Sequence, residues 1–352
     1  MEAKCPKIDE NIGRRVVVFG YLRFFLAFLV LLSHIGVRFF TLNPGVVAVV
    51  IFYLLAGFVV SHIYTDILPD TKYKLLYFYK DRILRIFPLY LYVLLLSVIF
   101  VSVTSYGNPD FSFTKMLYNV TVIPLNYYMY LDSTILSNPP WCLIPPAWSL
   151  GTELQAYLLL SLLFVFKKIT PFFVGVSIVI YIVSNFSLIN PDYFGYRLLV
   201  GVFFIFFTGT LIQKISAKNA QGFEKYFPFF IWITVLFLVP IFYLSNSFSP
   251  TYTKETFLGL LVGIPLLFFM AQVRIKLPFN SLLGSLSYGV FLSHFFAIWI
   301  LDFIAFPKHN FLLYVSALTT LSLLVAYIGV STVEKKVKNI REFNSSIKKN
   351  KL

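Results

Sequence analysis

Ten long apolar stretches dominate this chain of 352 residues and restrict what it can fold into. A helix needs about 20 mostly apolar residues to cross the ~30 Å hydrocarbon core of a bilayer. The composition agrees, with 59% hydrophobic and 12% charged residues and a mean hydropathy of +0.81. We therefore predict an all-α polytopic membrane helix bundle with about ten transmembrane helices, at residues 16–38, 44–64, 86–104, 149–166, 170–189, 196–213, 227–245, 256–272, 281–303 and 311–333.

The distribution of basic residues predicts how this bundle is oriented. Short cytoplasmic loops collect Lys and Arg, whereas translocated loops contain few. With the N-terminus inside, the cytoplasmic segments hold 23 basic residues and the outer segments hold five, which predicts that both termini are cytoplasmic. The net charge of +14 then reflects topology and contact with anionic membrane lipids. No nucleic-acid partner is expected, because no aromatic-interleaved basic patch occurs in a soluble domain.

The segments outside the spans are short, with one exception. We divide the chain into a cytoplasmic N-terminal segment at 1–15, a transmembrane domain at 16–333 and a basic cytoplasmic tail at 334–352, so chemistry is expected within the bundle. The exception is the outer connection at 105–147, which is long enough to suggest a function. Its aromatic residues suit stacking on sugar rings, or equally an interfacial belt on lipid headgroups; they include Tyr127, Tyr128, Tyr130 and Trp141.

Two ionisable residues, Arg23 and His34, lie inside the first apolar stretch. Eleven helical steps of ~100° bring both side chains to one face, about 16 Å apart along the axis. Ionisable groups at membrane depth are costly unless they face a polar pathway. The pair therefore indicates a functional site, although a snorkelling Arg and a hydrogen-bonded core His are the structural alternative.

Short motifs follow along the chain and are informative in combination. Their order and spacing resemble the acyltransferase-3 family of membrane O-acyltransferases, and the resemblance covers residues 16 to 334. It rests on Arg23-x10-His34, on Arg82-x-x-Arg85-Ile-x-Pro88, on Trp148-Ser149-Leu-x-x-Glu153, and on the string from Ser287-Tyr288 to Ser293-His294. The chain departs from the family pattern at Gly20, Ala56, Phe291 and after Glu334, which puts its subgroup in doubt.

The resemblance implies transfer of an acyl group, commonly acetyl from acetyl-CoA, onto hydroxyls of extracytoplasmic glycans. It also implies that Arg23 and His34 are the family's functional pair, that Arg82 and Arg85 are its second basic motif, and that Glu153 is its acid.

The predicted topology suggests roles for the same residues. His34 and Glu153 are expected at one depth near the outer face, where the carboxylate would orient the imidazole as a general base. Arg82 and Arg85, three residues apart at the inner surface, suit the phosphates of a CoA donor, with Arg23 guiding its thiol arm. Arg82 and Arg85 are explained as well by the positive-inside rule alone.

A second group of candidates comprises Tyr288, His294, Trp148 and Ser149. Tyr288 is suited to donate a hydrogen bond to a developing oxyanion, whereas bonds between helices explain Tyr288 and His294 equally well. No metal site is proposed, because neither His62 nor His309 has a partner at ligand spacing.

The sequence thus predicts an acetyl-CoA-dependent or other acyl-CoA-dependent O-acyltransferase, multi-pass in a bacterial inner membrane, with no permanently bound cofactor. Its expected acceptor is a cell-surface or lipid-linked polysaccharide, such as a lipopolysaccharide or exopolysaccharide. Two alternatives stay open: a glycan or acyl-carrier transporter or flippase that makes no bond, and an inactive scaffold of envelope synthesis.

Overall fold

The computed structural model describes residues 19–244, 250–273, 275 and 277–337. Within this part of the chain, nine helices are long and apolar enough to cross a membrane, and α1 is a shorter apolar helix. Each of the ten predicted spans coincides with one of these helices, which confirms the polytopic all-α bundle. Their bounds are α1 Phe19–His34, α2 Pro44–His62, α3 Lys74–Thr104, α5 Ala147–Val165, α6 Thr170–Asn185, α7 Leu199–Ser216, α8 Phe227–Leu244, α9 Thr253–Gln272, α10 Asn280–Phe303 and α11 Phe311–Gly329.

Most predicted boundaries lie within about four residues of the observed helix ends, and the start of α3 differs most. Helix α3 begins at Lys74, twelve residues before the predicted start of the span, so Arg82 and Arg85 lie on the same continuous helix as the span. The charged residues of this segment resemble a loop in sequence, although none of them prevents a helix. At the other end, α11 continues through the π-helix η6 (Val330–Glu334) as helix up to Val337, beyond the predicted end at 333.

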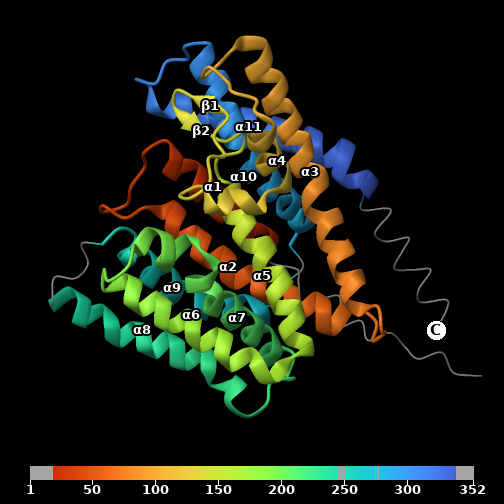
Figure 1. Ribbon diagram of the computed structural model, residues 1–352, viewed down its shortest axis with the longest axis vertical. Helices are drawn as coiled ribbons and strands as arrows, with labels where there is room; N and C mark the ends of the chain where they lie inside the picture. The colour runs from red at the N-terminus through yellow and green to blue at the C-terminus, as the bar shows by residue number, and fades with distance from the viewer. Residues whose placement is uncertain (1–18, 245–249, 274, 276, 338–352) are drawn as a thin grey trace, which may run out of the picture.

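The helices form two groups joined by α2 and α5 (Figure 1). One group contains α1, α3, α10 and α11, in which α10 packs against both α1 and α11. The other contains α6, α7, α8 and α9. Helix α2 contacts α1 on one side and α7 and α9 on the other, which makes it the central helix of the bundle.

Glycines permit the closest helix contacts. A Cβ built on Gly57 of α2 would lie 1.8 Å from the Phe206 carbonyl oxygen of α7, and one on Gly209 would lie 1.8 Å from the Leu54 carbonyl oxygen. Small residues that bring backbones together are the usual device for packing helices in lipid, where apolar burial gives no driving force. Gly20, which departs from the family pattern, has the same role, since its Cβ would meet the Asn280 carbonyl oxygen of α10 at 1.9 Å.

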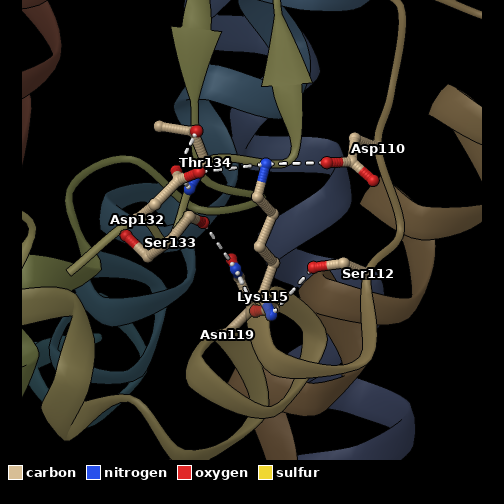
Figure 2. Close-up of polar contacts among 7 residues, drawn as sticks. All are labelled: Asp110, Ser112, Lys115, Asn119, Asp132, Ser133 and Thr134. Atoms are coloured by element: carbon tan, nitrogen blue, oxygen red, sulfur yellow. Dashed lines mark hydrogen bonds and ion pairs between the residues drawn. The ribbon is translucent and has the colours of Figure 1, made fainter.

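The long connection between α3 and α5 is folded rather than extended. It contains α4 (Phe113–Thr121), the 3₁₀-helix η2 (Ile123–Tyr127) and a hairpin of β1 (Leu136–Ser137) and β2 (Pro140–Trp141). Figure 2 shows Lys115 of α4 with its ammonium 2.8 Å from Asp110 and 3.2 Å from Asp132. Buried Asn119 donates to the Ser133 carbonyl at 2.9 Å, and these contacts attach α4 to the hairpin.

Candidate active site

A partly open cavity lies where the end of α1 meets the starts of α2, α5, α7 and α9. Its walls combine aromatic rings with a few polar groups, as small-molecule sites commonly do. The aromatic part consists of Trp148, Tyr196, Tyr252 and Phe291, and the polar part of Ser33, His34, Asn43, Ser149 and Arg197.

His34, the last residue of α1, lines this cavity and keeps an exposed side chain. Its Nδ1 lies 3.1 Å from Nε2 of His294, which is fully buried on α10. The two rings are stacked with centroids 5.0 Å apart. A ring of Phe295 packs edge-on against His34 at 4.9 Å, and Trp141 of β2 packs on Phe295 at 5.4 Å. The folded outer connection therefore supports the ring from the side.

Arg197 forms another wall of the cavity, at the end of the π-helix η4 (Tyr193–Arg197) that precedes α7. Its guanidinium lies 4.3 Å from the ring centre of Trp148, and the rings of Tyr196, Tyr128 and Tyr252 lie at 5.3, 5.4 and 5.9 Å. Its Nε donates to Asp192 at 2.7 Å. Such cation–π contacts are each worth about 0.5–2 kcal/mol, so this aromatic cage holds a positive charge beside His34.

Tyr128, which lies outside the spans in the connection between α3 and α5, contributes one ring of the cage. Burial raises the pKa of its hydroxyl to about 12. Tyr128 therefore contributes a neutral ring to the cage at neutral pH.

The floor of the cavity is fixed by the start of α2. Asn43 is the N-cap residue, and its side-chain oxygen accepts a hydrogen bond from the Gly45 backbone at 3.0 Å. The backbone N–H of Asn43 donates to the buried carboxylate of Glu255 on α9 at 3.0 Å. Pro44 follows at the first helical position, where a missing N–H costs nothing. The sequence Asn-Pro-Gly thus starts α2 directly below His34.

The second polar region surrounds Arg23, eleven residues before His34 on α1 and about 16 Å away along the axis. Arg23 lies within electrostatic range of Glu153, Tyr157 and Arg82. Glu153 in turn lies within range of Arg85 as well, so one carboxylate interacts with three guanidiniums. We call Arg23, Arg82, Arg85 and Glu153 the arginine cluster.

Both arginines of α3 have partners. Arg82 is buried, its Nε donates to Asp81 at 3.1 Å, and its guanidinium lies 5.8 Å from the ring centre of Tyr157. Arg85 donates to Glu334, which follows α11 and also accepts from Ser285 at 3.0 Å. The two arginines thus connect α3 to α5 and to the end of α11.

The predicted pairing of Glu153 with His34 is wrong in the structure. Glu153 accepts a hydrogen bond from the Tyr157 hydroxyl and faces the arginine cluster, whereas His34 bonds to His294. The reason is depth. His34 is the final residue of α1, but α5 begins at Ala147, so Glu153 lies about 9 Å below the first residue of α5.

The predicted secondary candidates divide between the two regions. Trp148 and Ser149 line the cavity, and His294 bonds to His34. Tyr288 does not reach His34, because its hydroxyl donates to the Ile86 carbonyl at 3.1 Å and its ring lies 5.9 Å from Arg85. The cavity residues that the sequence did not indicate are Asn43, Tyr196, Arg197 and Tyr252. Only a weak signal, a basic residue directly after the aromatic-rich segment Tyr193-Phe194-Gly195-Tyr196, could have pointed to that wall.

In the part of the chain that the structure describes, no group of three or more His, Cys, Asp or Glu side chains is arranged to hold a metal ion. Cys142 is a free thiol, and Cys5 lies outside the described residues.

The fold is a multi-pass membrane helix bundle with two polar regions along α1. The family model for the acyltransferase domain matches residues 18–330, nearly the whole chain. The chain therefore belongs to the acyltransferase-3 family and is a multi-pass membrane acyltransferase.

Two relatives are uncharacterized proteins. One, from Aquifex aeolicus, is 42% identical over 217 residues, which is 60% of this chain and 98% of that protein. The other, from Haemophilus influenzae, is 25% identical over 155 residues, which is 41% of this chain and 61% of that protein. No solved structure matches this chain.

Proposed function

We propose that this protein is an O-acyltransferase of a bacterial inner membrane that moves an acyl group, in the first instance acetyl, from cytoplasmic acyl-CoA to a glycan hydroxyl outside the cytoplasm. The acceptor is a cell-surface or lipid-linked polysaccharide. The observation that carries the proposal is the position of His34, with one ring edge in an aromatic cavity and the other on His294.

The cavity is the acceptor site in this proposal. Sugar rings present apolar faces that pack on aromatic side chains, and the walls formed by Trp148, Tyr196 and Tyr252 supply such surfaces. Asn43 and Ser149 add hydrogen-bonding groups for hydroxyls. His34 is then within the same space as the hydroxyl that is to be acylated.

The arginine cluster is the donor side. Guanidinium groups match phosphate geometry, and Arg23, Arg82 and Arg85 gather at the end of the bundle that the basic residues predict to be cytoplasmic. A separation of about 16 Å between Arg23 and His34 suits the long thiol arm of a CoA thioester. Asp81 and Glu334 now hold Arg82 and Arg85, so donor phosphates compete with these carboxylates.

The chemistry is a direct acyl transfer. Nε2 of His34 takes the proton of the acceptor hydroxyl while the hydroxyl oxygen attacks the thioester carbon. The C–O bond forms, the C–S bond breaks, and the leaving thiolate receives the proton from the imidazolium. The products are the O-acyl glycan and free CoA. The Arg197 guanidinium, held in its aromatic cage, stabilises negative charge on the thioester oxygen.

The test uses purified full-length protein in lipid vesicles with radiolabelled acetyl-CoA and polysaccharide extracted from the source cells. We expect label in the polysaccharide and a mass gain of one acetyl group per modified sugar. His34→Ala should abolish the transfer while the protein remains inserted and folded. A His62→Gln variant, which changes a buried histidine bonded to Asp66 away from the cavity, should keep full activity.

Two results would contradict the proposal. Vesicles that transport the glycan or acetyl-CoA without forming labelled product would identify a transporter. Undiminished transfer by His34→Ala would remove His34 from the chemistry.

A further inference from the structure

We infer that His294 is a positioning residue that holds the proton of His34 on Nδ1, so that the lone pair of Nε2 faces the cavity. This inference deepens the proposed function, in which His34 is the base, and rests on it for its catalytic meaning. The arrangement of protons itself follows from hydrogen bonds alone.

The first step concerns His294. Its Nδ1 lies 3.2 Å from the carbonyl oxygen of Val290, one turn earlier on α10. A carbonyl oxygen only accepts hydrogen bonds, so Nδ1 of His294 carries a proton. The ring is fully buried and contacts apolar rings and His34, an environment that disfavours a charged imidazolium. In the neutral ring, Nε2 of His294 is therefore an acceptor.

The second step follows for His34. Its Nδ1 lies 3.1 Å from the Nε2 acceptor of His294, so Nδ1 of His34 must be the donor. The two hydrogen bonds of His294 thus select one tautomer for His34.

The third step is the consequence for the cavity. In a neutral imidazole with its proton on Nδ1, the other nitrogen has a free lone pair. Nε2 of His34 is the ring nitrogen that His294 does not engage, and we infer that it faces the cavity that His34 lines. A base must present an unprotonated nitrogen to the hydroxyl that it activates. His294 thus orients the imidazole of His34, which is the role that the sequence suggested for Glu153, but it adds no charge.

The tautomer is measured directly by ¹⁵N NMR of histidine-labelled full-length protein in micelles. The chain contains four histidines, so the ring resonances can be assigned from single variants. We expect His34 to be protonated on Nδ1 in the wild type. In His294→Phe, which keeps a flat ring but removes the acceptor, we expect His34 to shift toward protonation on Nε2. A wild-type His34 protonated on Nε2 overturns the inference whatever the activity.

Kinetics supply the second readout. His294→Phe should lower kcat about 10- to 100-fold, the usual effect of losing a group that orients a reactive histidine. His294→Gln keeps an amide oxygen that accepts from Nδ1 and should recover part of this loss. The KM for acetyl-CoA should stay within about twofold of wild type in both variants, because His294 does not line the cavity and belongs to α10, outside the arginine cluster.

The outcomes separate the two proposals. If the wild type transfers no acyl group, the proposed function fails, and NMR still decides the tautomer. If the wild type is active but the Phe and Gln variants lose activity equally, or lose only thermal stability, His294 is a packing residue and the inference is wrong. His62→Gln, the matched change at another buried histidine, should alter neither kcat nor the His34 resonance.

Discussion

The two polar regions on α1, one at Arg23 and one at His34, accommodate their polar side chains in different ways. At Arg23, positive charge is gathered and balanced, since the arginine cluster has a carboxylate at its centre and Asp81 and Glu334 at its edges. At His34, the ring bonds to a second imidazole, and the other side faces an open cavity.

This difference indicates where chemistry takes place. A compensated charge cluster is stable in its resting form and responds to an anionic ligand by exchanging partners. An imidazole with one nitrogen fixed and one nitrogen accessible is already arranged to take a proton. We therefore expect changes at the arginine cluster to affect stability and donor binding, and changes at His34 to affect the reaction rate.

The largest effect should come from His34→Gln. General base catalysis typically contributes 10²–10⁴-fold, so kcat should fall by about that factor. The KM for acetyl-CoA and the thermal unfolding temperature should change little, because His34 ends its helix and lines the cavity. Steady-state kinetics and unfolding in micelles measure both. A raised KM with an unchanged kcat would break the distinction between the two regions.

Glu153→Gln should have the next largest effect, on stability. Removing the carboxylate takes away a counter-charge within range of three guanidiniums. Because Glu153 is half-buried, the loss should fall between about 1 kcal/mol for an exposed pair and about 3–5 kcal/mol for a fully buried one. Denaturant unfolding in micelles measures this loss. The matched control is Glu224→Gln, which breaks the more accessible pair with Lys214 at 2.6 Å and should cost about 1 kcal/mol or less.

A stable Glu153→Gln protein that has lost activity would reverse this interpretation. Glu153 would then act in the reaction, as the sequence suggested, despite its distance from His34.

Two glycine substitutions compare the packing of the same two regions. In Gly20→Ala, near Arg23, the new Cβ would meet the Asn280 backbone oxygen at 1.9 Å, so α1 and α10 must separate, at about 1–3 kcal/mol. In Gly45→Ala, the Cβ would meet Ser33 Oγ at 2.2 Å and Ser33 Cβ at 2.8 Å. The hydroxyl can rotate away, whereas the Cβ contact requires a small shift of the side chain rather than a separation of two backbones. We expect Gly20→Ala to lower the unfolding temperature more than Gly45→Ala does. Equal losses would mean that the cavity floor is as tightly packed as the arginine cluster.

The sequence predicts much of the fold because span length and charge asymmetry are local properties. It does not predict which face of a span is buried, because lipid and protein core are equally apolar. Helices α2 and α8 illustrate this. Both are strongly apolar, yet 78% of the most apolar part of α2 is buried in the protein and only 28% of that of α8.

The candidate site was predictable only in part, because helical periodicity relates residues within one helix but not residues on different helices. Arg23 and His34 share one helix, so helical periodicity alone relates them. His34 and His294 are 260 positions apart, and their contact depends on α1 packing against α10. Glu153 was misplaced because its depth depends on where α5 begins, which hydropathy locates only within a few residues. In the sequence, Arg197 is only a basic residue of an outer segment. Its aromatic cage depends on contacts between separate segments, such as that with Trp148, which the structure shows.

The smallest expected effect is the pH dependence of the stability that the outer connection between α3 and α5 contributes. This connection serves as a reference for the two polar regions on α1. Hydrogen bonding by Thr134 lowers the pKa of Asp132, and hydrogen bonding to Asp110 raises the pKa of Lys115. A lowered carboxyl pKa gives stability that is present above the ordinary value of about 3.9 and lost as the pH falls through the folded value. A raised ammonium pKa gives stability that is complete below about 10.4 and lost as the pH rises above it.

Between about pH 5 and 9 the outer connection should therefore contribute a constant stability, and Lys115→Met should cost about 1 kcal/mol or less throughout. Unfolding of both proteins, measured across this range, tests the expectation. If wild-type activity falls toward pH 5 while the effect of Lys115→Met stays constant, the titrating group lies in the bundle, where protonation of His34 Nε2 removes the base. If the effect of Lys115→Met itself varies between pH 5 and 9, the outer connection is part of the pH response and no longer a neutral reference for the two regions.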